Sequence, residues 1–241
     1  MFYIGNKKVK IFTDGANLDS IMKLAADPVI DGITTNPTLM RKSGVTNYMS
    51  FANAAVNYSN DKSISLEVFS DDFDEMVEQA KILSKLGKQV YVKIPITNSK
   101  GEYTDKVIRK ILDQNIKINI TAILTKEQID LATNIFKKDE FGYLSIFAGR
   151  IADTGKDPNI FFDYAYQRIE SRQLENVELL WASTREVYNI YQAVLGNCDI
   201  ITAPPEIIKK LALFNYDLKD LSLETVQMFK RDSEKANYII K

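Results

Sequence analysis

The chain has 241 residues, 45% of them apolar and 26% charged, and its 31 basic side chains nearly balance its 32 acidic ones. This balance excludes a strong surface field for nucleic acid or anionic lipid, so we expect neither a nucleic-acid nor a membrane partner. Histidine is absent, which removes the commonest metal ligand and the side chain most used as an acid or base near neutral pH.

Cysteine usage and the amino-terminal residues indicate a soluble, cytoplasmic protein. The single cysteine, Cys198, cannot form an intramolecular disulfide, which fits a reducing compartment. No window approaches the roughly 18 consecutive apolar residues of a membrane-spanning helix. The first eight residues become charged too soon for a signal peptide.

Short apolar and β-branched runs recur along the whole chain and predict strands. In chain order they cover residues 10–14, 30–35, 63–68, 89–94, 116–121, 142–147, 178–183 and 198–202.

Helical periodicity separates these runs. Among the expected helices are residues 71–86, 125–136 and 184–195. Asp71 or Asp72 would cap the first of these and Gly87 would end it. The second begins with Thr-Lys-Glu-Gln from Thr125, a capping-box pattern, and the third runs to Gly196.

Eight alternations of strand and helix, without a linker or a break in composition, favour a closed (β/α)₈ TIM barrel that forms one domain over residues 1–241. An open doubly wound sheet is the alternative, although the chain lacks the Gly-x-Gly-x-x-Gly fingerprint. Residues 219–241 predict an additional C-terminal helix, with apolar contacts from Leu221, Val226, Phe229 and Tyr238. This tail would cap the barrel or dock on a neighbouring subunit, so we expect a homo-oligomer.

Polar side chains stand at the ends of the predicted strands. They are Asp14, Thr34, Thr35, Asn36, Glu67, Lys93, Asn119, Thr121, Ser145, Ser183 and Thr202, with Arg185 just beyond the seventh strand. Each has an ordinary explanation alone: a lysine can mark an edge strand, an aspartate a turn, and an arginine the solvated surface. Because the carboxyl ends of barrel strands meet at one mouth, their joint placement favours a site.

An inward lysine at such a mouth suits covalent chemistry. Burial disfavours the ammonium form, although two nearby carboxylates would favour it. A neutral amine can attack a ketone and form an imine that permits cleavage of the neighbouring carbon–carbon bond, as in class I aldolases. Asp14 and Glu67 could divide the acid-base steps around Lys93, with Thr121 holding a water. Arg150, Ser183 and Arg185 could bind a phosphate.

At these positions the chain resembles the short transaldolase subfamily that includes fructose-6-phosphate aldolase. The matching segments are Asp14-Gly-Ala-Asn17, Asp31-Gly-Ile-Thr-Thr-Asn-Pro-Thr-Leu39, Val92-Lys-Ile-Pro-Ile-Thr97, Asn119-Ile-Thr121, Ser145-Ile-Phe-Ala-Gly-Arg-Ile151 and Ala182-Ser-Thr-Arg185. They span most of the chain and follow in the family's order.

The resemblance implies a role for each matching residue. Lys93 would form the imine, Asp14 would act in carbon–carbon cleavage, and Glu67 with Thr121 would handle water. The substrate would be bound by Asn36, Asn119 and Ser145 at the dihydroxyacetone unit and by Arg150, Ser183 and Arg185 at the phosphate, with Thr34 and Phe147 as further substrate-binding residues. The implied partners are sugar phosphates, with no metal or organic cofactor.

Two positions favour a transaldolase over an aldolase, and the resemblance to transaldolases implies a place in the pentose phosphate pathway. The aldolases tend to carry glutamine at the position of Glu67 and tyrosine at that of Phe147. Transfer of dihydroxyacetone from fructose 6-phosphate or sedoheptulose 7-phosphate to an aldose phosphate is therefore expected. Departures from the family, notably residues 98–103, leave three alternatives: direct aldol cleavage, an unusual sugar in polysaccharide precursor synthesis, and a sugar-phosphate binding protein without turnover.

Overall fold

Eight parallel strands close into a barrel in the computed structural model, which describes residues 2–4 and 6–240. Each strand pairs with the next along the chain, and pairing of the last with the first closes the ring. The strands are β2 (Lys7–Asp14), β3 (Ile30–Thr34), β4 (Ser63–Glu67), β5 (Val90–Pro95), β6 (Ile118–Ile123), β7 (Gly142–Ile146), β8 (Val177–Trp181) and β9 (Ile200–Ala203). The predicted (β/α)₈ barrel is confirmed, and the open sheet is excluded.

A short strand that the sequence did not reveal, β1 (Phe2–Ile4), pairs antiparallel with the start of β2. Its pairing partners are Lys7 to Val9, which explains why β2 begins three residues before the predicted Lys10. Three residues are too few to carry a periodic pattern, so only the pairing shows this strand.

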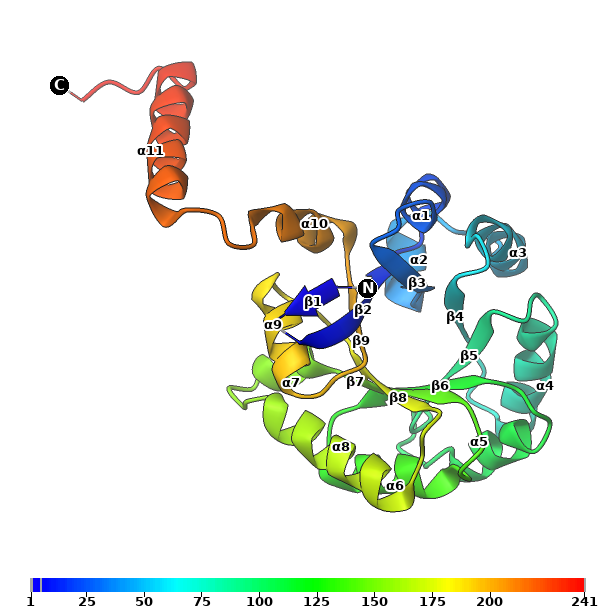
Figure 1. Cartoon of the computed structure of the whole chain (residues 1–241). Coiled ribbons are helices and arrows are strands. Elements are labelled where there is room, and N and C mark those ends of the chain that lie inside the picture. Colours follow the sequence, from blue (N-terminus) through cyan, green and yellow to red (C-terminus); the bar gives the residue numbers. More distant parts are fainter. Residues whose placement is uncertain (1, 5, 241) are drawn as a thin grey trace. The chain divides into compact units, whose positions relative to one another are not determined.

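The helices lie around the outside of the ring of strands (Figure 1). They are α1 (Leu18–Ala25), α3 (Tyr48–Tyr58), α4 (Phe73–Ser84), α5 (Asp105–Leu112), α6 (Lys126–Ile135), α8 (Asn159–Arg172) and α9 (Tyr188–Leu195). Three shorter helices, α2 (Pro37–Lys42), α7 (Ala148–Ala152) and α10 (Pro205–Ile208), follow β3, β7 and β9 directly. Among the described residues, no helix is long and apolar enough to cross a membrane.

The predicted N-caps of α6 and α4 and the predicted end of α9 at Gly196 are confirmed, whereas the end of α4 and the start of α9 differ from the prediction. Thr125 caps α6 in a complete capping box, and Asp72 caps α4. However, α4 ends at Ser84 instead of at Gly87, which forms the turn into β5 through its carbonyl. The predicted start of α9 at Thr184 is wrong, because the Thr184 hydroxyl bonds the Thr202 carbonyl and the helix begins only at Tyr188.

A hydrophobic cluster fills the inside of the barrel below the mouth. Phe12, Tyr143, Leu180, Ala182 and Ile200 form this cluster, and Tyr91 stacks on Tyr143 with ring centroids 3.9 Å apart. Phe12, Tyr91 and Tyr143 each stand two residues before a polar residue predicted for the site. Since alternate residues of a strand face the same side, these rings form a layer directly beneath the polar layer.

The described chain divides into two compact units, one up to Ile208 and one from Lys209 on. The second holds a 3₁₀ turn (Lys209–Leu213) and α11 (Leu218–Lys235), which Asp217 caps. The predicted tail helix is present but ends at Lys235, six residues before the predicted boundary. None of its residues is buried, and Val226 and Phe229 are each more than 60% exposed.

Candidate functional site

The strand register places the predicted catalytic residues near the carboxyl end of the barrel, in two sets of laterally paired residues. Lys93 on β5 stands level with Glu67 on β4 and with Asn119 on β6. Asp14, the last residue of β2, stands level with Thr34, the last residue of β3. The ladder therefore gathers in space residues that lie more than 100 positions apart in the sequence.

Lys93 is buried, with only 6% of its surface exposed. Its Nζ donates to the Thr35 carbonyl at 3.0 Å and lies 3.4 Å from Glu67 Oε2. The Glu67 side chain is also largely buried, at 13% exposure. Burying a lysine and a carboxylate inside a barrel mouth costs desolvation free energy, and an apolar pair could fill the same space without that cost. This buried pair is therefore the strongest candidate for the chemical centre of the site.

Asp14 forms the second carboxylate of the mouth. Its Oδ1 accepts from the Thr34 hydroxyl at 2.9 Å, and its Oδ2 accepts a longer bond of 3.4 Å from Asn36 Nδ2. Thr34 and Thr202 have their hydroxyl oxygens 2.6 Å apart, so Thr202 donates when Thr34 donates to the carboxylate. Asn36 also caps α2, which fixes its position.

Burial raises the pKa of Asp14 above its ordinary value of 3.8, and the negative charge of Glu67 adds to the rise. The positive charge of Lys93 and the hydrogen bonds from Thr34 and Asn36 oppose it, but burial is the largest effect. A carboxylate whose pKa is raised is a stronger base, which suits acceptance of a proton.

A fully buried polar chain lines the side of the mouth formed by β4, β6 and β7. Ser145 Oγ donates to Asn119 Oδ1 at 2.6 Å, and Asn119 Nδ2 donates to Ser65 Oγ at 3.1 Å. Ser65 was missed by the sequence analysis. Its position two residues before Glu67 on one strand is the signal that could have revealed it.

Thr121 lies beside a bulge in β6. Ala122 has a φ of +62°, and the pairing with β7 shifts between Ile120 and Ile123. A left-handed alanine costs about 1–2 kcal/mol, so the bulge is retained against a local penalty. The Thr121 hydroxyl is buried without a hydrogen-bond partner in the described structure, which leaves it able to bind a ligand or a water.

The loops after β7 and β8 meet at a close backbone contact. A Cβ added to Gly149 would lie 1.8 Å from the Ser183 carbonyl oxygen, so only glycine fits there. Ser183 itself is left-handed, with a φ of +64°. This contact places Ser183 beside the helix that carries Arg150, whose guanidinium carbon is 5.8 Å from the centre of the Phe147 ring.

Arg185 is about half exposed and is bound to Asp153. Its Nη2 donates at 2.6 Å to Asp153 Oδ2, and its Nε donates a longer bond of 3.4 Å to Oδ1. Hydrogen bonding to the guanidinium lowers the pKa of Asp153. The predicted residues thus fall into two groups: one around Lys93, and one of Phe147, Arg150, Ser183 and Arg185 on the loops after β7 and β8.

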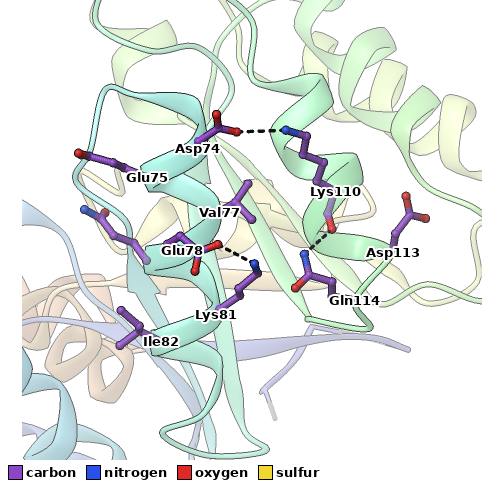
Figure 2. A pocket seen from close by; sticks show the side chains of 10 residues that line it. Asp74, Glu75, Val77, Glu78, Lys81, Ile82, Lys110, Asp113 and Gln114 are labelled. Atoms are coloured by element: carbon purple, nitrogen blue, oxygen red, sulfur yellow. Dashed lines mark hydrogen bonds and ion pairs between the residues drawn. The ribbon is translucent and has the colours of Figure 1, made fainter.

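A hollow of about 740 Å³ lies away from this mouth, between α4 and α5 on the outer surface (Figure 2). Four of its charged residues form two pairs, Lys110 with Asp74 at 3.2 Å and Lys81 with Glu78 at 2.6 Å. Solvent-exposed ion pairs of this kind contribute little and provide no reactive group, so we do not regard the hollow as the site. The described residues contain no group of His, Cys, Asp and Glu side chains that could hold a metal ion.

Comparison with known proteins agrees with the resemblance in sequence. The model of the family described as "Transaldolase/Fructose-6-phosphate aldolase" matches residues 11–239. A "Probable transaldolase" of Nitrosopumilus maritimus is 32% identical over 236 residues, which cover 95% of this chain and 96% of that protein. Another of Mesorhizobium japonicum is 33% identical over 223 residues, covering 89% of this chain and 93% of that protein.

Among solved structures, KGPDC from Streptococcus mutans is similar in fold. The TM-score is 0.53 at 13% sequence identity, with coverage of 84% of this chain and 90% of that chain. At this identity the similarity concerns the barrel alone, and it carries no conclusion about chemistry.

Proposed function

This chain belongs to the transaldolase/fructose-6-phosphate aldolase family, a group of transaldolase-type enzymes, and we propose that it transfers a dihydroxyacetone unit from a donor to an acceptor. During the transfer the unit would be bound to Lys93 as an imine. The donor would be a ketose phosphate such as fructose 6-phosphate or sedoheptulose 7-phosphate, and the acceptor an aldose phosphate. The observation that carries the proposal is the buried Lys93 amine, 3.4 Å from the Glu67 carboxylate inside the barrel mouth.

Imine formation needs a neutral amine and an acid for the departing water. The Lys93 amine attacks the ketone carbon of the donor, and the carbinolamine then loses its hydroxyl group as water. Glu67 is the carboxylate paired with Nζ and can pass on the proton that the leaving hydroxyl takes up. The unpartnered Thr121 hydroxyl supports a role in binding the water that leaves or returns.

Carbon–carbon cleavage needs a base at the hydroxyl beyond the breaking bond. Asp14 takes that proton, the bond breaks to release an aldose phosphate, and its electron pair moves into the protonated imine to form an enamine. Addition of the enamine to a second aldose phosphate, followed by hydrolysis of the imine, reverses these steps. The bonds from Thr34 and Asn36 to the carboxylate of Asp14 support this assignment because they orient it.

Substrate binding would be shared between the two groups of residues. Asn36, Asn119 and Ser145 offer neutral hydrogen-bonding groups for the hydroxyls of the dihydroxyacetone unit. Arg150, Ser183 and Arg185 would bind the phosphate, for which Arg185 must share or exchange its bonds to Asp153. The phenyl ring of Phe147 cannot hydrogen-bond a hydrolytic water, which supports transfer over release of free dihydroxyacetone.

Borohydride trapping tests the proposal. Incubation with fructose 6-phosphate and reductant should add a three-carbon or six-carbon mass to the peptide that holds Lys93. Lys93→Met should abolish both the adduct and the activity. Lys117→Met is the matched control, since Lys117 is a partly buried lysine beside the amino end of β6, 4.7 Å from the Tyr91 ring centre. No adduct on the unaltered protein would contradict the proposal.

Direct aldolase action separates from transfer in a second assay. Turnover without erythrose 4-phosphate that is as fast as turnover with it would favour the aldolase. A panel of aldose acceptors would also test the hypothesis that the substrate is an unusual sugar. Residues 98–103, which follow the Lys93 strand and depart from the family's usual sequence, favour this hypothesis. Those residues form a hairpin around the buried Asn98, whose Oδ1 accepts from the backbone amides of Lys100 and Glu102.

We propose in addition that the protein is a cytoplasmic homo-oligomer that takes only small sugar phosphates as partners. The support is the unburied apolar side chains of α11, among them Leu218, Val226 and Phe229, which a neighbouring subunit could cover. Light scattering in solution, with and without residues 209–241, measures the subunit number. A monomeric full-length chain would contradict this part of the proposal.

A further inference from the structure

Tyr48, the first residue of α3, reaches the residue that is paired with the lysine. Its hydroxyl donates to the backbone carbonyl of Glu67 at 2.9 Å. Glu67 is the last residue of β4, and its carboxylate lies 3.4 Å from Lys93 Nζ. Tyr48 comes from the connection between β3 and β4, so this hydrogen bond joins a separate element to the centre of the site.

The peptide unit that follows Glu67 is held at both of its polar groups. On one side the Val68 amide donates to the Lys93 carbonyl at 3.1 Å, which is the last bond between β4 and β5. On the other side the Glu67 carbonyl accepts from Tyr48. Because this peptide plane sets the backbone dihedral ψ of Glu67, the two bonds together restrict the direction of the Glu67 side chain.

The position of Tyr48 is itself fixed. Its ring packs edge-on against Phe69, with ring centroids 4.5 Å apart, and Asn47 caps α3 at the preceding residue by accepting from Ser50. Burial raises the pKa of Tyr48, and the negative charge of Glu67 raises it further. The phenol therefore stays protonated and remains a hydrogen-bond donor throughout the physiological range.

We propose that Tyr48 is a positioning residue that holds the Glu67 carboxylate against Lys93 for imine formation. This inference rests on the proposed function, because it assigns Tyr48 a task in the step that Glu67 and Lys93 carry out. Tyr48 acts through the backbone of Glu67 and not on the substrate. Its removal should therefore slow the formation and hydrolysis of the imine and leave acceptor binding unchanged.

Tyr48→Phe removes the hydroxyl and keeps the ring that packs on Phe69. Tyr58→Phe is the matched control, since Tyr58 is the exposed last residue of the same helix. Imine formation is followed by the rate of borohydride trapping at Lys93 and by exchange of the ketone oxygen of dihydroxyacetone with ¹⁸O-water. We expect both rates and kcat to fall roughly tenfold in Tyr48→Phe, because small misplacement of a catalytic group costs up to about 10²-fold. KM for erythrose 4-phosphate should not rise, as binding of the acceptor does not involve the amine, and it falls together with kcat when imine formation limits the rate.

Hydrogen exchange provides a readout that does not depend on turnover. The Val68 amide should exchange faster in Tyr48→Phe and at the normal rate in Tyr58→Phe, since only the first change frees the peptide unit after Glu67. Normal imine formation in Tyr48→Phe would overturn the inference and leave the proposed function intact. An equal loss in both variants, or a rise in the acceptor KM without slower trapping, would overturn it as well. No adduct on the unaltered protein would overturn the proposed function and this inference together.

Discussion

Replacing Gly149 by alanine should damage the phosphate side of the site while leaving the lysine side intact. An alanine Cβ would lie 1.8 Å from the Ser183 carbonyl oxygen and 3.0 Å from both its carbonyl carbon and its Oγ. Two of the three contacts are backbone atoms, so no side-chain rotation can relieve them. The helix that carries Arg150 must then move away from the loop that carries Ser183.

The expected cost follows from overpacking, which typically destabilises by about 1–3 kcal/mol. For a chain of this size each kcal/mol lowers the melting temperature by roughly 2–4 °C. If the loops after β7 and β8 bind the phosphate, the KM for fructose 6-phosphate should rise about tenfold, equivalent to about 1.4 kcal/mol of binding. Trapping of unphosphorylated dihydroxyacetone on Lys93 should continue at nearly the normal rate.

Urea denaturation and steady-state kinetics with both donors measure these effects. Gly15→Ala is the matched control, because Gly15 also lies in a mouth loop but has no atom within 4 Å of an added Cβ. It should be neutral or should stabilise by about 0.4–1 kcal/mol through the unfolded state. A Gly149→Ala variant with normal stability would refute the steric argument. A variant with lower stability but an unchanged KM for fructose 6-phosphate would refute the assignment of phosphate binding to the loops after β7 and β8.

Three further predictions concern Asp14 and Asp71. Asp14→Asn should reduce kcat by about 10²-fold or more, in the range of acid-base catalysis, measured as transfer to erythrose 4-phosphate. Because the folded pKa of Asp14 is raised, the native state binds its proton more tightly and stability is lost as pH rises through about 3.8 and above. Asp14→Asn should therefore gain free energy of unfolding at pH 7 and not below pH 3.8, and a loss at pH 7 would contradict the pKa direction. Asp71 accepts hydrogen bonds from the amide and the hydroxyl of Ser99, so Asp71→Ala should loosen the hairpin over residues 98–103. The acceptor KM should then change by several-fold. Unchanged kinetics across an acceptor panel would show that this hairpin does not determine which acceptor is used.

Several features of the site could be predicted from the sequence alone because they depend on the periodicity of side chains along a strand and on the order of motifs along the chain. Alternation along a strand placed Lys93 and Glu67 inward, and their positions near strand ends placed them at the mouth. The capping box at Thr125 was equally local and was confirmed. The roles of these side chains in catalysis stay predictions, since they depend on a bound substrate.

Contacts between distant segments could not be predicted in this way. The predicted start of α9 at Thr184 was wrong because the Thr184 hydroxyl donates a hydrogen bond to the Thr202 carbonyl, which lies on a later strand. The bond from Tyr48 to Glu67 joins a helix start and a strand end whose distance is set only by packing. The pairing of Arg185 with Asp153 spans 32 positions and depends on where two loops meet.

The sequence by itself determined the barrel, the lysine in it and the family, because short-range periodicity and motif order are properties of the chain. Tertiary structure decided the rest: which carboxylate lies beside Lys93, which hydroxyl stays without a partner, and which arginine is already paired. The physical reason is that burial, desolvation and hydrogen bonding are set by neighbours in space, and these come from all eight strands at once.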